Sequence, residues 1–175
     1  ENINENITMK LKNTIYTLLL TLLLATSVTA GEPKVGVFDV NQSVIKIPVH
    51  EGVSVDDARD AMMSKATELN LKNVGRQHVS AELIARGEKS GHLEIFQFCR
   101  PTDARTMVEF NVIYAAYMPC RISMVEDGAG QVWLVTLNLD MFIENVILPN
   151  NIQRLAIETN NSMLTIMTAG ATGEF

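Results

Sequence analysis

Basic charge is scarce in this sequence of 175 residues. Lys and Arg together number 14, against 20 Asp and Glu, so the formal net charge is −6, and the basic residues do not cluster. A protein that binds nucleic acid needs a stripe of Lys and Arg to neutralise phosphates. We therefore expect no nucleic-acid partner.

The signatures of common enzymes are also missing. The sequence has no Gly-x-Ser-x-Gly, no Walker loop, no Gly-x-Gly-x-x-Gly and no His-Glu-x-x-His. Its two cysteines form neither a Cys-x-x-Cys pair nor a haem-attaching Cys-x-x-Cys-His motif. The sequence thus indicates no catalytic residue and no cofactor, and it favours a protein that is not an enzyme.

Clusters that could bind a metal are equally hard to find. The three histidines, His50, His78 and His92, lie in separate segments. His92 precedes Cys99 by seven residues, and an odd separation puts two residues on opposite faces of a strand. The acidic pair Glu126–Asp127 falls at a turn, where carboxylates have local structural roles. We assign no metal site.

Long apolar runs are absent, apart from one near the start. Thr14–Leu24 is only 11 residues long, whereas a membrane-spanning helix needs roughly 20. A short basic segment precedes it and the small residues Val28–Ala30 follow it, which is the pattern of a secretory signal peptide. We expect a signal peptide over residues 9–30, cleaved after Ala30, and a non-native extension over residues 1–8. The remaining protein is then periplasmic or secreted, without membrane association.

Residues 31–175 contain no internal repeat, low-complexity tract or Pro/Gly linker, and we expect a single domain there. Removing residues 1–30 takes away two basic and two acidic side chains, so the net charge of −6 is unchanged. The sequence is 47% apolar and 19% charged, which is typical of a globular protein. At this size about two-thirds of the chain's surface can be buried, enough for a core without disulfides.

Strand and helix patterns are clear in the first half of this domain. Residues 35–49 favour a strand or a hairpin, and residues 72–79 favour a second strand. Ser54 and Asp57 have the spacing of a capping box, which predicts a helix start. One face of that helix carries residues of helical spacing: Ala58, Met62, Ala66 and Leu69. Residues 80–86 favour a helical turn that stops at Gly87.

The second half begins with a strand over His92–Cys99, which is rich in aromatic and β-branched residues. Thr102 is expected to cap a helix that extends towards Tyr117. Residues 120–126 and 131–137 predict a hairpin, because the Asp-Gly-Ala-Gly between them is typical of a tight turn. Helices are expected over residues 139–148 and from residue 151 onward.

This order of elements predicts an α+β protein. Its sheet is mainly antiparallel, its helices lie on one face, and its C-terminal tail is helical. The alternation of strand and helix that marks a parallel, doubly wound sheet is absent.

Two segments carry a resemblance to a known family. Phe98-Cys99-Arg100-Pro101 ends one strand, and Tyr117-Met118-Pro119-Cys120-Arg121 leads into the next. Together with the acidic, Gly-containing hairpin, they resemble the domain of unknown function 302 family over about residues 44–137. Arg100 and Arg121 stand where that family often has Asn. The resemblance implies a TATA-binding-protein-like β-α-β4-α fold that often forms a homodimer.

The two cysteines permit three interpretations. Cys99 closes one strand and Cys120 opens another, so neighbouring strands would bring both sulfurs to one edge of the sheet. They could form a structural disulfide in an oxidising compartment, worth about 3 kcal/mol of stability. They could be separate thiols that pack as small apolar groups. They could also be a redox-active or metal-binding pair, favoured by Arg100 and Arg121, since a neighbouring cation lowers the pKa of a thiol.

Three functions follow from these features. The first is a non-enzymatic binding or accessory module, which holds an unknown small molecule or protein partner in a groove near the cysteines. Its candidate groove residues are Arg100, Pro101, Pro119 and Arg121. The second is a thiol-disulfide or sulfur-handling protein that uses Cys99 and Cys120. The third is a structural protein that self-associates through a sheet edge or the face that carries Trp133.

Overall fold

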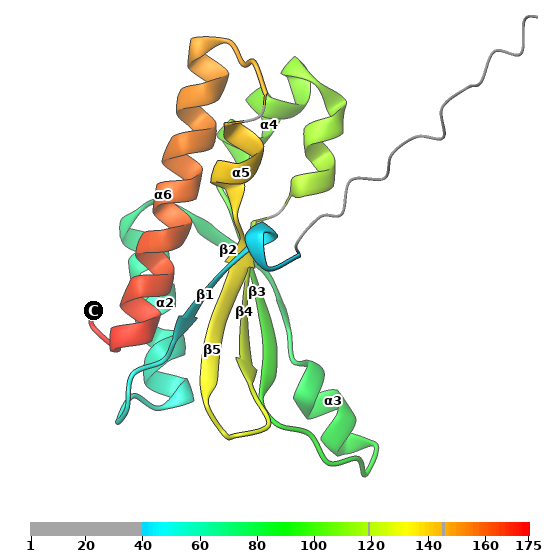
Figure 1. The fold of residues 1–175 in the computed structure, drawn as a ribbon, viewed down its shortest axis with the longest axis vertical. Coiled ribbons are helices and arrows are strands. Elements are labelled where there is room, and N and C mark those ends of the chain that lie inside the picture. Colours follow the sequence, from blue (N-terminus) through cyan, green and yellow to red (C-terminus); the bar gives the residue numbers. More distant parts are fainter. Residues whose placement is uncertain (1–39, 119, 145) are drawn as a thin grey trace, which may run out of the picture. The chain divides into compact units, whose positions relative to one another are not determined.

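The computed structural model describes residues 40–118, 120–144 and 146–175 (Figure 1). Five strands form one antiparallel sheet in the order β1-β5-β4-β3-β2. The strands are β1 (Val44–Pro48), β2 (Lys72–Gln77), β3 (Leu93–Cys99), β4 (Cys120–Glu126) and β5 (Val132–Leu137). The predicted hairpin is confirmed as β4 and β5.

Two long helices pack on this sheet, and short helical segments connect its strands. The long helices are α2 (Val55–Glu68) and α6 (Asn150–Thr172). The short ones are η1 (Val40–Ser43), α3 (Val79–Ala85), α4 (Pro101–Phe110), η2 (Val112–Tyr117) and α5 (Leu139–Ile143). Figure 1 shows α2 and α6 side by side against the same face of the sheet. The β-α-β4-α order with helices on one face is therefore confirmed.

Helix α2 begins as its sequence predicts. The Ser54 hydroxyl accepts a hydrogen bond from the backbone N–H of Asp57 at 3.1 Å, and the Asp57 carboxylate accepts one from the backbone N–H of Ser54 at 3.3 Å. These two bonds satisfy amide groups that a helix start leaves unpaired. On the inner face of the helix, Ala58, Met62 and Ala66 are fully buried, as expected.

Three sequence expectations about helices were wrong. Thr102 does not cap α4, because Arg100 occupies the cap position and Pro101 is the first helical residue, where the fixed φ of proline favours a helix. The helix ends at Phe110 instead of extending towards Tyr117. The helix expected over residues 139–148 is only the five residues of α5.

No described helix is long and apolar enough to cross a membrane.

The core lies between the sheet and the two long helices. Strand alternation directs Phe96 and Phe98 of β3 towards the helices, and both are fully buried. The neighbouring strands and α6 contribute further buried apolar side chains: Ile122, Met124, Leu134, Met163, Ile166 and Met167. The methionines thus fill the core, where their flexible side chains adapt to irregular gaps.

The two long helices are in close contact at Gly170. A Cβ atom at this position would lie 2.9 Å from Leu134 Cδ1 and 3.2 Å from the Ala58 carbonyl oxygen, and closer still to Met62. Only the absence of a side chain lets α6 pack this tightly on α2 and β5. The sequence signal for this contact is a single glycine within an otherwise helical stretch.

Glu94 lies near the N-terminal end of β3, at the centre of a buried ion cluster. Its carboxylate is 2% exposed and pairs with Arg76 of β2, and with Arg59 of α2 at 3.3 Å. His78 Nδ1 lies 3.1 Å and His92 Nε2 3.5 Å from the same carboxylate. A buried charge is tolerated only when it is paired in this way.

We predict that Gly170→Ala destabilises the fold by about 1–3 kcal/mol, the usual cost of overpacking a core. Gly128→Ala is the matched control, because a Cβ atom there meets nothing within 4 Å. Urea unfolding followed by the fluorescence of Trp133 measures both. Equal stability of the two variants would contradict the close contact between α6 and α2.

We predict that Glu94→Gln destabilises the protein by about 3 kcal/mol, because it leaves Arg59 and Arg76 without their buried counter-charge. Asp56→Asn is the control. Asp56 also pairs with Arg59 but is 80% exposed, and such pairs contribute only about 0–1 kcal/mol. A similar loss in both variants would show that Glu94 is not the centre of the cluster.

The pH dependence of Glu94→Gln follows from the pKa of Glu94. Burial alone raises this pKa, but the hydrogen bond and charge of Arg76, with the charge of Arg59, bring it below the ordinary value. Its stabilisation is therefore complete above the unfolded-state pKa of about 4.3 and is lost as the pH falls through the lower folded-state pKa. The stability gap between wild type and variant should narrow below about pH 4. A constant gap from pH 7 to pH 3 would refute this.

Candidate ligand-binding cavity

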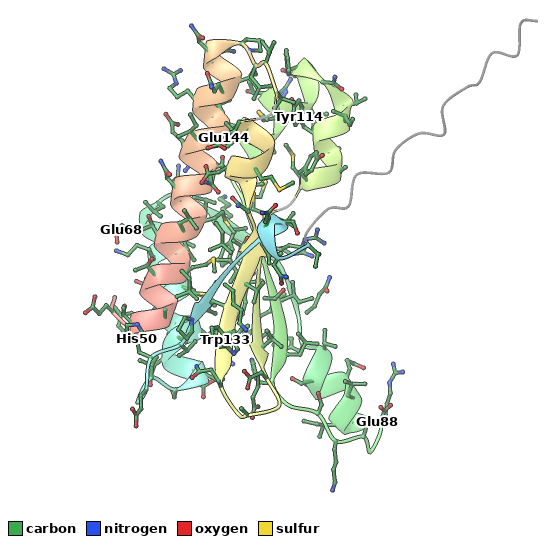
Figure 2. The ribbon with its side chains drawn as sticks, in the orientation of Figure 1. His50, Glu68, Glu88, Tyr114, Trp133 and Glu144 are labelled. Atoms are coloured by element: carbon green, nitrogen blue, oxygen red, sulfur yellow. The ribbon has the colours of Figure 1, made fainter. Side chains whose placement is uncertain are left out.

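A cavity of about 250 Å³ lies where β3 ends and β4 begins. Phe98 and Cys99 of β3 and Cys120 of β4 form its floor. Its walls come from α4, η2, the segment over residues 139–148 and the N-terminal half of α6. Figure 2 shows Tyr114 and Glu144 at this end of the molecule, away from Trp133 on the sheet. Ligand sites are typically concave and mostly apolar, and this cavity has that character.

One wall is built by the break between α4 and η2. Asn111 ends α4 with an extended backbone, and its side-chain oxygen accepts a hydrogen bond from the N–H of Ile113 at 3.0 Å. The chain therefore turns back as a tight 3-10 segment, which directs Ile113, Tyr114 and Tyr117 to the cavity. The ring of Tyr114 lies 6.0 Å from that of Phe110, a separation typical of aromatic pairs.

The opposite wall is fixed by a polar contact between α5 and α6. The buried side chain of Asn160 donates a hydrogen bond to the Asp140 carboxylate at 2.8 Å. This bond holds α5 against α6, so that Leu139 and Ile143 face the cavity together with Leu155 of α6.

The cavity carries no unbalanced charge. Arg100 and Asp103 are the only charged residues among its described lining residues. They pair with each other at 2.7 Å, and Arg100 also donates to the Leu69 carbonyl oxygen at 3.2 Å. No histidine lies among the described lining residues. The described lining can therefore make apolar contacts with a ligand. It provides neither a general base nor an unpaired charge for the ligand.

The two cysteines meet at the cavity as free thiols in this structure. Cys120 of β4 lies opposite Phe98 of β3, so Cys99 is one residue beyond the position opposite Cys120. Successive side chains in a strand point to opposite faces. Alternation along the strands alone would direct the two side chains to opposite faces of the sheet, yet both line the cavity where β3 ends and β4 begins.

Burial makes both thiols poor nucleophiles. Burial, and then the nearby Cys99, raise the pKa of Cys120 to about 11. Burial, and then the charge of Asp103, also raise the pKa of Cys99. Reactive cysteines need the opposite shift, because the thiolate is the attacking species. The cationic Arg121 does lower the pKa of Cys120, as its sequence suggests, but burial outweighs it.

The remaining groove residues predicted from the sequence are more dispersed. Arg100 lines the cavity, but Pro101 is an exposed helix-start residue outside its lining. Arg121 is exposed and pairs across the sheet with Gln97, on the face that Cys120 does not occupy. Pro119 lies outside the described residues. The described residues also contain no group of three His, Cys, Asp or Glu side chains suited to a metal ion.

Sequence reasoning missed most of the cavity. Its aromatic and aliphatic walls come from segments for which the sequence predicts only helices. Their lining residues are Met107, Ile113, Tyr114, Leu139, Ile143 and Leu148. One available signal was that apolar residues around Val112–Tyr117 do not form the single stripe of an amphipathic helix. The Glu94 cluster was missed too, although Glu94 alternates in phase with Phe96 and Phe98 and so had to point inward.

Comparison with known proteins identifies the family of this chain and a solved structure with a similar fold. The family profile for "Domain of unknown function DUF302" matches residues 45–170. The chain belongs to this family. Among solved structures, it is similar to the crystal structure of an uncharacterised conserved DUF302 protein from Bacillus stearothermophilus, with a TM-score of 0.59 and 13% identity. That match covers 72% of this chain and 96% of the other. No curated protein matches the chain.

We predict that Cys120 of the folded protein resists alkylation near neutral pH. A rise of its pKa from 9.0 to about 11 leaves roughly one hundredth of the ordinary thiolate fraction. Timed iodoacetamide labelling, read by intact mass with single Cys→Ser variants, measures each rate, and labelling in urea is the control. Rapid labelling of native Cys120 would contradict its burial, and a mass lower by two hydrogens would reveal a disulfide.

Proposed function

We propose that this protein is a non-enzymatic binding module, exported from the cell, that takes up an apolar small molecule in the cavity beside Cys99 and Cys120. The observation that carries the proposal is the pairing of Arg100 with Asp103 inside an otherwise apolar cavity. Because these charges neutralise each other, binding depends on shape and apolar surface. The expected ligand is therefore uncharged in the part that enters the cavity.

The chemistry of the cavity favours binding over reaction. General acid–base catalysis needs a titratable group whose pKa is near the working pH. The two thiols have raised pKa values, and Asp103 is held by Arg100. The short apolar run at residues 14–24 supports an exported location. The family fold carries no function by itself, so the proposal depends on the cavity.

We predict that the protein binds N-phenyl-1-naphthylamine, an uncharged dye whose fluorescence rises in apolar surroundings. Ala156→Phe should reduce its affinity by about tenfold or more, equivalent to ~1.4 kcal/mol, because Ala156 lines the cavity and a Phe side chain would fill it. Ala81→Phe is the matched control, since Ala81 is exposed on α3 outside the cavity. Fluorescence titration gives the dissociation constants.

A second readout separates binding from misfolding. A ligand that binds only the folded state raises its stability, by about 2.7 kcal/mol at a hundredfold excess over the dissociation constant. The dye should raise the melting temperature of the wild type and of Ala81→Phe, and it should raise that of folded Ala156→Phe clearly less, because the affinity of this variant is lower. Equal dye affinity in Ala156→Phe, or no binding by the folded wild type, would refute the proposal.

A further inference from the structure

Large apolar side chains are exposed around the cavity. They come from the end of α4, from η2 and from the segment between α5 and α6. We call them the apolar rim: Phe110, Val112, Ile113, Tyr117, Val146 and Ile147. Ile147 is 103% exposed, Val112 76% and Ile113 60%. Single exposed apolar residues are ordinary, but a group of this size at one site marks an interaction surface.

The apolar rim and the cavity share side chains. Ile113, Tyr117 and Val146 line the cavity and are also exposed to solvent. These three side chains therefore border both the cavity and the solvent. A partner that covers these three side chains would therefore also adjoin the cavity.

We propose that the apolar rim docks onto the surface of a lipid bilayer, and that the ligand is a lipid-soluble molecule which passes between the bilayer and the cavity. The proposal rests on the proposed function, because it names the source of the apolar ligand. It departs from the sequence expectation of no membrane association after signal cleavage. The contact proposed is peripheral.

The composition of the rim fits a bilayer interface. Its aliphatic members, Val112, Ile113, Val146 and Ile147, can enter the acyl region, and tyrosine is enriched at the level of the headgroups. An apolar ligand with no charged partner in its cavity is itself concentrated in a membrane and scarce in water. A bilayer therefore supplies both a surface for the rim and a reservoir for the ligand.

The charges near the rim specify the kind of bilayer. On α4, Arg105 pairs with Glu109 at 2.8 Å, and on α6, Arg154 lies 3.8 Å from Glu158. These neighbours leave no surplus of basic charge near the rim, and the chain as a whole carries −6. Binding to anionic lipid headgroups depends on clusters of Lys and Arg. Docking should therefore be apolar, work on zwitterionic lipid and be insensitive to salt.

The test is flotation of the exported protein, its N-terminus verified by intact mass, with phosphatidylcholine vesicles. The variant Val112→Asp/Ile147→Asp places two charges on the rim at positions that do not line the cavity. Ile84→Asp is the matched control, because Ile84 is 60% exposed on α3, which Figure 1 shows at the far end of the sheet from α4. We expect the double variant to lose about tenfold or more of vesicle binding, and Ile84→Asp to bind like wild type.

Dye binding in solution separates this inference from the proposed function. The double variant should still bind N-phenyl-1-naphthylamine, since its cavity lining is intact, and raising the salt concentration should leave wild-type flotation unchanged. Failure of the wild type to float, or equal flotation of the double variant, would overturn the docking proposal while leaving dye binding untouched. A dimer that the double variant dissociates, without flotation of the wild type, would overturn it in favour of a second copy on the rim.

Discussion

The architecture depends on the packing of α6 along α2 and across the sheet. The C-terminal half of α6 packs closely at Gly170, where the missing side chain of α6 leaves room for Met62 of α2 and Leu134 of β5. Its 23 residues span about 34 Å, whereas strands of five to seven residues span only about 17–24 Å. A helix that is anchored at one end of so short a sheet must project beyond the other. The cavity exists because α4, η2 and α5 close around that projecting half.

The inner face of β3 links the two ends of the molecule. Glu94, Phe96 and Phe98 alternate along it, so the strand runs from a buried ion cluster, through the core, to the cavity floor. Ion pairs with Arg59 and Arg76 tie α2 and β2 to this strand at one end. At the other end the strand is surrounded by the mainly apolar cavity lining, in which Arg100 and Asp103 pair with each other. The buried ion cluster and the candidate cavity thus lie at opposite ends of one strand.

Local sequence patterns predict the helices and strands, whereas the position and lining of the cavity depend on tertiary packing. The capping box of Ser54 and Asp57, the alternation in His92–Cys99 and the Asp-Gly turn each act within a few residues, so the sequence expresses them directly. The cavity depends on the difference in length between α6 and the sheet, which no local pattern encodes. The facing of Cys99 and Cys120 likewise depends on strand register, since a shift of one residue moves a side chain to the other face. Glu94 could have been recognised, because its phase with Phe96 points it inward.

The distribution of burial suggests how a ligand enters. Helix α6 contributes many buried residues to the core, including Met163, Ile166 and Met167, whereas α4 and η2 contain none. Segments with little buried surface open at lower free energy than the core around them. We therefore expect the wall formed by α4 and η2 to open more easily than the wall formed by α6. This wall also carries Val112 and Ile113 of the apolar rim, so under the docking proposal the element that meets the bilayer would also be the one that admits the ligand.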